Sequence, residues 1–145
     1  MEKVSLPINP AEKQKLSIGV KTKIVALWMM TIGGIVVIFF STLLVITREQ
    51  STPIGPLLFV FNSPPAALFF LAGLLLFLKR KRWAWWFATI ISIGVMTFYS
   101  ILFRHGPGGF GFDILSIAIL LLPFSSLISL IFLLLDRKNF WKIAT

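Results

Sequence analysis

Four long runs of uncharged, mostly apolar residues make up most of the chain, and short polar or basic segments separate them. As a helix, the first run at 24–46 would be about 34 Å long, enough to cross a hydrocarbon core of about 30 Å. The pattern predicts an all-α fold, a four-transmembrane-helix bundle with short loops at 24–135. The expected spans are 24–46, 64–78, 83–103 and 114–135, between a polar tail at 1–23 and a basic, aromatic tail at 136–145.

The second run differs from the others because Asn62, Ser63, Pro64 and Pro65 interrupt it. Two adjacent prolines remove two backbone donors, so a helix cannot pass this point without a kink. Ser63 has the form of an N-cap, and Pro64 suits the first helical position. We therefore expect the second span to begin at Pro64. Residues 57–61 would then lie at the outer interface, re-enter the membrane, or form part of a kinked helix.

The polar tail at 1–23 carries one local helix signal. Asn9 has the form of an N-cap, Pro10 suits the first turn, and Glu12 follows three residues after Asn9. Two structures fit this signal, a short surface helix from Pro10 toward Leu16 or a solvated tail.

Composition agrees with a membrane location. Hydrophobic residues make up 57% of the 145 residues, charged residues 13%, and the mean hydropathy is +0.93. Soluble domains are about 45–50% apolar and about 25% charged, so this composition excludes an ordinary soluble protein and a disordered one. The chain has no cysteine, which excludes disulfides, thiolate zinc sites, iron–sulfur ligation and thiol redox chemistry.

The charge distribution predicts an orientation. The net charge of +9 comes from basic residues that flank the apolar runs, so we interpret them as topology signals and expect no nucleic-acid partner. With four spans, the two tails and the turn at 79–82 share one side, which holds 12 of the 14 Lys and Arg; Arg48 and Arg104 lie on the other. The positive-inside rule places both termini in the cytoplasm (N-in/C-in) of a multi-pass protein of the cell membrane.

Small residues predict which helix faces pack together, because helices in lipid associate through close backbone approach and shared hydrogen bonds. Each run has one stripe of small or polar residues at helical spacing. The residues that we expect at the helix-packing faces are Gly34, Ser41, Gly73, Ser92, Ser125 and Ser129. Larger side chains, among them Phe69 and Ile90, are expected to face lipid.

Candidate chemistry within the spans is sparse. No Asp, Glu, Lys, Arg or His lies in any of the four runs, which argues against a proton-coupled transporter and against the small multidrug exporters with their buried Glu. His105 and Asp113 in the loop after the third run are the one acid–base pair to consider. A lone His without a second His or Cys is a weak metal ligand. We therefore predict no catalytic, cofactor-binding or metal-binding residue, and no enzyme activity.

Two segments are candidate binding sites. Asn62, Pro64 and Pro65 mark the break in the second run, where the amide can bond freed backbone groups or, as in transporters with broken helices, contact a solute. The turn at 79–82 is a candidate for binding anionic lipids on the cytoplasmic face, because basic residues beside a span attract anionic headgroups. Its four residues are Lys79, Arg80, Lys81 and Arg82.

The basic entry into the third run, 79–86 (KRKRWAWW), and the tail at 136–141 (DRKNFW) resemble the interfacial anchors of small bacterial four-helix integral membrane proteins. The resemblance covers about residues 20–142 and implies a fold and a location, without an active site. The function that we expect is that of a non-catalytic accessory protein, scaffold or small subunit, which packs with a partner, itself or lipids. The alternatives are a transporter or channel-like oligomer for a neutral or apolar solute, and an enzyme that acts on a lipid through the outer loops.

Overall fold

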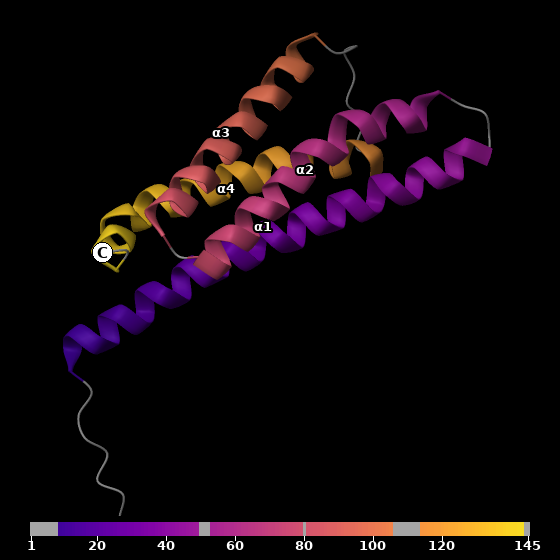
Figure 1. The fold of residues 1–145 in the computed structure, drawn as a ribbon. Helices are drawn as coiled ribbons and strands as arrows, with labels where there is room; N and C mark the ends of the chain where they lie inside the picture. The colour runs from indigo at the N-terminus through magenta and orange to yellow at the C-terminus, as the bar shows by residue number, and fades with distance from the viewer. Residues whose placement is uncertain (1–8, 50–52, 80, 106–113, 144–145) are drawn as a thin grey trace, which may run out of the picture.

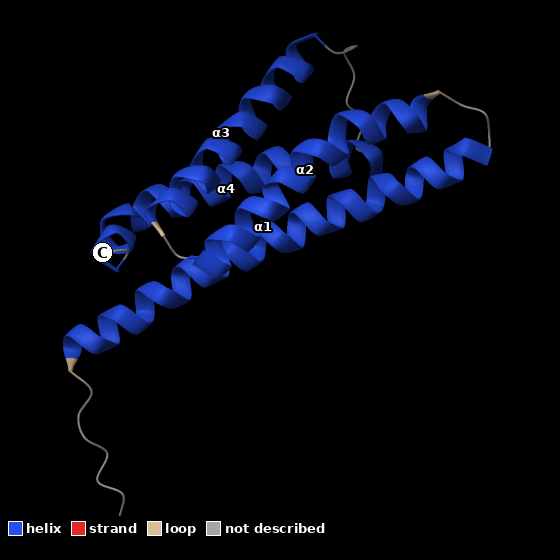
Figure 2. Ribbon diagram, viewed as in Figure 1, coloured by secondary structure: helices blue, strands red, loops and turns tan. Residues whose placement is uncertain are grey.

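The computed structural model describes residues 9–49, 53–79, 81–105 and 114–143, and nearly all of these residues are helical. The helices are α1 (Pro10–Glu49), α2 (Ile54–Lys79), α3 (Arg82–His105) and α4 (Ile114–Ile143). No strand occurs in these ranges (Figure 2). Each of the four helices contains a segment long and apolar enough to cross a membrane. The predicted all-α fold with four spans is confirmed.

The helices form a closed ring in which α1 contacts α2 and α4, and α3 contacts the same two helices. Successive helices run in alternating directions (Figure 1). The N-terminal part of α1, the turn between α2 and α3, and the C-terminal part of α4 therefore lie at one end of the bundle. Lys21, Lys79, Arg82 and Arg137 belong to these segments, and we call this the basic end.

Helix α1 is much longer than its membrane span. Its 40 residues cover Pro10–Glu49, and the apolar span begins at Lys21. The first part of α1 projects past the other helices at the basic end (Figure 1). The expected helix start at Pro10 is present, but it opens neither a separate short helix nor a solvated tail. Helix formers such as Lys, Gln and Glu follow it, and no further proline occurs before the end of α1, so the helix continues into the span.

The predicted start of the second span at Pro64 is wrong. Helix α2 runs from Ile54 to Lys79 with Pro64 and Pro65 inside it, so residues 57–61 are helical and Ser63 is not an N-cap. The physical reason is the cost of leaving backbone groups unpaired in lipid, which favours a continuous helix even where two prolines remove hydrogen bonds. The side chain of Asn62 adds local support because its Nδ2 donates to the carbonyl of Leu58 at 2.8 Å.

The contact between α1 and α2 is a seam of close backbone approach. A Cβ atom added at Gly73 would lie 2.7 Å from the carbonyl oxygen of Ala26 and 2.8 Å from Cβ of Met29. One added at Gly33 would lie 2.8 Å from the carbonyl oxygen of Ala66. Gly55 closes the seam at the other end, where a Cβ would overlap the side chain of Thr47. Only glycine allows backbones this close, so Gly33 and Gly73 set the spacing of the seam, while Gly55 leaves room for the side chain of Thr47.

The packing face of α1 differs from the predicted stripe. Gly34 and Ser41 are both partly exposed, and a Cβ at Gly34 would meet only the Phe70 ring at 3.8 Å. The buried face instead carries large residues together with Gly33; these include Met29, Ile32, Val36 and Phe40. The reason is complementarity between the two helices: α2 presents small residues to this face, so large side chains of α1 fill the space opposite them.

The other three helices agree better with the predicted stripes. Gly73, Ser92, Ser125 and Ser129 are buried, as expected for residues between helices. Ile90 is exposed as expected of a lipid-facing residue. Phe69 is fully buried, contrary to expectation, because its position on α2 points into the core cluster with Phe40 and Tyr99. Residue size alone therefore does not separate the lipid-facing positions from the core of this bundle.

Candidate functional site

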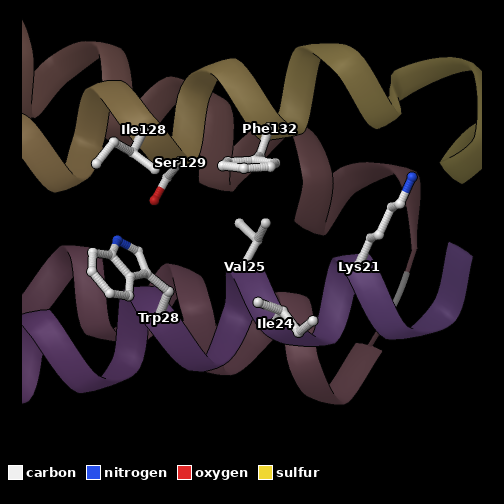
Figure 3. Close-up of a pocket in the computed structure, with 7 residues that line it drawn as sticks. All are labelled: Lys21, Ile24, Val25, Trp28, Ile128, Ser129 and Phe132. Carbon is white, nitrogen blue, oxygen red and sulfur yellow. The ribbon is translucent and has the colours of Figure 1, made fainter. Parts of the chain in front are cut away.

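A cleft lies between α1 and α4 at the basic end of the bundle (Figure 3). Its volume is about 320 Å³. Ligand pockets in proteins span about 300–1,000 Å³, so this cleft is at the small end of that range. The residues that line it are Lys21, Ile24, Val25 and Trp28 on α1, and Ile128, Ser129 and Phe132 on α4.

The floor of the cleft is formed by Val25 and Ser129, which are both buried. Ser129 is 1% exposed, and its Oγ has no hydrogen-bond partner among the described residues. Figure 3 shows this hydroxyl pointing from α4 into the gap between the helices. A buried hydroxyl without a partner is unfavourable, and it is one of few polar atoms on an otherwise apolar wall.

The rims of the cleft are apolar and partly exposed. Ile24 and Trp28 form the α1 rim, and Ile128 and Phe132 the α4 rim; Trp28 is 41% and Phe132 52% exposed. The cleft therefore opens sideways, onto the surface that faces lipid if the helices span a membrane. The indole nitrogen of Trp28 is on the ring edge turned toward Ser129 (Figure 3).

At the basic end, Lys21 lines both this cleft and a neighbouring cavity of about 180 Å³. The neighbouring cavity also contains Thr22 and Asp136, whose side chains are joined by a 3.0 Å hydrogen bond from Oγ1 of Thr22 to Oδ2 of the carboxylate. This bond links α1 to α4 close to the mouth of the cleft. The site thus combines the amine of Lys21, a hydrogen-bonded carboxylate and mostly apolar walls.

Trp85 on α3 closes the inner side of the neighbouring cavity. Its indole Nε1 donates to the carbonyl oxygen of Leu133 at 3.2 Å, and the side chain is buried. The sequence indicates an interfacial belt of tryptophans at the start of the third span. The structure instead separates them, since Trp83 and Trp86 are exposed while Trp85 packs in the core.

The predicted break site is a buried contact between α2 and α3. Asn62 is 1% exposed, and the hydroxyl of Tyr99 donates to its Oδ1 at 2.7 Å. Since Nδ2 of Asn62 donates to Leu58, both ends of the amide are engaged within the protein. Pro64 is exposed and Pro65 partly buried on the same helix. Tyr99 is the one tyrosine in the chain, but nothing in the sequence pairs it with Asn62.

The basic turn between α2 and α3 lies at the same end of the bundle as the cleft. Lys79, Lys81 and Arg82 are exposed, and Arg80 lies outside the described residues. None of the three lines the cleft, where Lys21 is the basic residue. Sequence reasoning did not single out Lys21, because five lysines precede the first span and nothing in the sequence distinguishes them.

The acid–base pair considered from the sequence falls outside the described part of the chain: Asp113 is not described, and neither is the side chain of His105. Among the residues that the structure describes, no three His, Cys, Asp or Glu side chains are grouped to hold a metal ion.

No family model, curated protein or solved structure matches this chain.

Proposed function

We propose that the chain is a non-catalytic accessory or scaffold protein of the cell membrane, which packs with a membrane-protein partner, a second copy of itself or lipids. The observation that carries this proposal is that polar side chains of the bundle form hydrogen bonds from one helix to another, inside the protein. Interhelical hydrogen bonds of Tyr99, Thr22 and Trp85 tie the four helices to one another. The apolar outer faces of the helices remain available to lipid or to another membrane protein.

The proposed orientation places both termini in the cytoplasm. Its support is the charge distribution along the sequence: with four spans, the two tails and the 79–82 turn share one side of the membrane and carry 12 of the 14 Lys and Arg. Basic residues in short loops beside spans favour the cytoplasmic side. A reporter enzyme that is active only outside the cytoplasm, fused after Thr145, should be inactive, and the same reporter inserted after Glu49 should be active. Activity of the C-terminal fusion would refute the orientation.

The test of the accessory function is native mass spectrometry on the protein gently extracted from its own membrane, combined with crosslinking before extraction. We expect a reproducible complex with a protein partner or with a second copy. A bare monomer in both measurements would contradict the scaffold proposal.

The two alternatives have less support. Permeation of a neutral solute at the Asn62 break would need a free amide, and this amide is held by Tyr99 and Leu58. An Asn62→Leu variant that folds and loses flux of a solute would nevertheless establish that alternative. Enzyme activity on a lipid would depend on His105, and a His105→Ala variant tests it by loss of turnover.

A further inference from the structure

We propose that the cleft between α1 and α4 binds one phospholipid with an anionic headgroup, with the phosphate beside Lys21 and an acyl chain along the apolar floor. This inference deepens the proposed function, since it names the lipid class and the place where that lipid binds. Four features of the cleft support it: its size, its direction of opening, an unpaired polar atom and the local charge.

The size of the cleft fits a single flexible chain. A volume of about 320 Å³ lined by seven side chains is too narrow for a whole helix, whose diameter with side chains is about 10–12 Å. A helix from a partner or a second copy could rest on the rims but could not enter between Val25 and Ser129. An acyl chain, by contrast, is thin and can enter from the side.

The direction of opening gives the acyl chain a route from the bilayer. The exposed rims formed by Trp28 on α1 and Phe132 on α4 leave the cleft open to the lipid-facing surface. The uncharged run of α1 begins at Ile24, just after Lys21, so in a membrane the amine would lie at headgroup depth and Val25, one turn further along, in the hydrocarbon layer. A lipid in this position keeps its headgroup at the interface.

The hydroxyl of Ser129 supplies the polar contact that an apolar groove alone would lack. It is buried, has no partner among the described residues, and points into the cleft. The ester carbonyl of a phospholipid is an acceptor that lies between headgroup and chain. A hydrogen bond from Ser129 to this carbonyl would satisfy the hydroxyl, and the nearby indole N–H of Trp28 is a second donor.

The local charge selects an anionic headgroup. Lys21 is the basic residue among those that line the cleft, and the carboxylate of Asp136 lies in the neighbouring cavity that Lys21 also lines. That carboxylate already accepts a hydrogen bond from Thr22. Each basic side chain near an anionic headgroup contributes about 1 kcal/mol, which corresponds to about fivefold in affinity.

The experiment measures lipid binding to the purified full chain by native mass spectrometry, in titrations with phosphatidylglycerol and with phosphatidylcholine of identical chains. We expect one phosphatidylglycerol to bind about fivefold more tightly than phosphatidylcholine. Lys21→Gln should abolish this preference. Lys23→Gln is the matched control, since Lys23 is an exposed lysine of the same helix that does not line the cleft.

A second pair of variants tests the floor. Ser129→Ala should weaken the binding of both lipids by about fivefold, the effect of one hydrogen bond. Ser126→Ala should leave binding unchanged, although Ser126 is equally buried on α4 and its hydroxyl is also unpaired, because it does not line the cleft. The two serines are alike in burial and in having an unpaired hydroxyl, and of the two Ser129 lines the cleft.

Any of four results would overturn the inference. Equal binding of the two lipids would show that the headgroup charge plays no part. Equal losses for Lys21→Gln and Lys23→Gln, or no loss for Ser129→Ala, would show general attraction to a basic surface. Formation of a dimer that excludes lipid would show that a second copy of the chain covers the cleft. Since these titrations need no partner, their failure leaves the scaffold proposal standing, and a missing partner leaves the lipid site standing.

Discussion

Helix α1 contacts two neighbours in very different ways. Toward α2 it forms a seam in which Gly33 and Gly73 bring backbones into direct contact. Toward α4, at the basic end, bulky side chains such as Trp28 and Phe132 stand at the rims, and a cleft of about 320 Å³ remains between the helices. The same helix is thus tightly packed on one side and open on the other.

The difference shows that side-chain size at the contact sets the distance between helices in lipid. Where one helix offers glycine or alanine, the opposite helix fills the space with a large residue, and van der Waals contact holds the pair together. Where both helices offer large residues at the rim and a small one at the floor, a gap forms beneath the rims. A gap of this kind is a place for a lipid chain.

The largest expected effect concerns the seam. Gly33→Ala places a methyl group against the backbone of α2 and should destabilise the bundle by about 1–3 kcal/mol. Gly34→Ala is the matched control, and should leave stability unchanged or raise it by up to about 1 kcal/mol because alanine favours the helix. The free energy of unfolding, measured by denaturant titration in mixed micelles, separates the two. Equal destabilisation by both variants would contradict the close approach of Gly33 to the backbone of α2.

A smaller effect is expected at the buried contact between α2 and α3. Tyr99→Phe removes the hydroxyl that donates to Asn62, and should cost about 1 kcal/mol, in the range found for interhelical hydrogen bonds in membranes. A double-mutant cycle with Asn62→Leu measures the coupling. If the two changes add within about 0.3–0.5 kcal/mol, the hydrogen bond contributes nothing to stability.

The smallest effect is expected at the cleft when no lipid is present. Ser129→Ala should change the unfolding free energy by less than about 0.5 kcal/mol, because its hydroxyl has no partner to lose. Ser126→Ala should behave alike. Adding phosphatidylglycerol should then stabilise the Ser126→Ala variant more than the Ser129→Ala variant, measured as a shift in Tm. A large loss for Ser129→Ala without lipid would mean that the serine holds α4 to the bundle.

Much of the fold was predictable because a chain in lipid must satisfy its backbone hydrogen bonds internally, which few structures allow. Helix number followed from the length of the apolar runs, since each backbone group in hydrocarbon must be paired within its own helix. The same rule explains why the prediction that the second span begins at Pro64 was wrong. In water two prolines would end the helix, whereas in a membrane the continuing helix costs less than unpaired carbonyls at 57–61.

The candidate site was less predictable. The sequence drew attention to Ser129 as a small residue and to Asn62 as a polar one, without showing which of them lines a cavity. The structure places Asn62 in a closed hydrogen bond with Tyr99 and leaves Ser129 unpaired at the floor of the cleft. Lys21 belongs to the site only because Ser129 and Phe132 of α4, more than a hundred residues away in the chain, line the same cleft.

The sequence by itself determined that four helices form, how long their apolar runs are, and that the basic residues collect at one end, because these follow from local composition and backbone hydrogen bonding. Only the tertiary structure decided that Gly33 rather than Gly34 meets α2, that Phe69 is buried, and that a cleft lies between α1 and α4. These outcomes depend on the rotation of each helix about its axis, which is set by the shapes of the side chains opposite it.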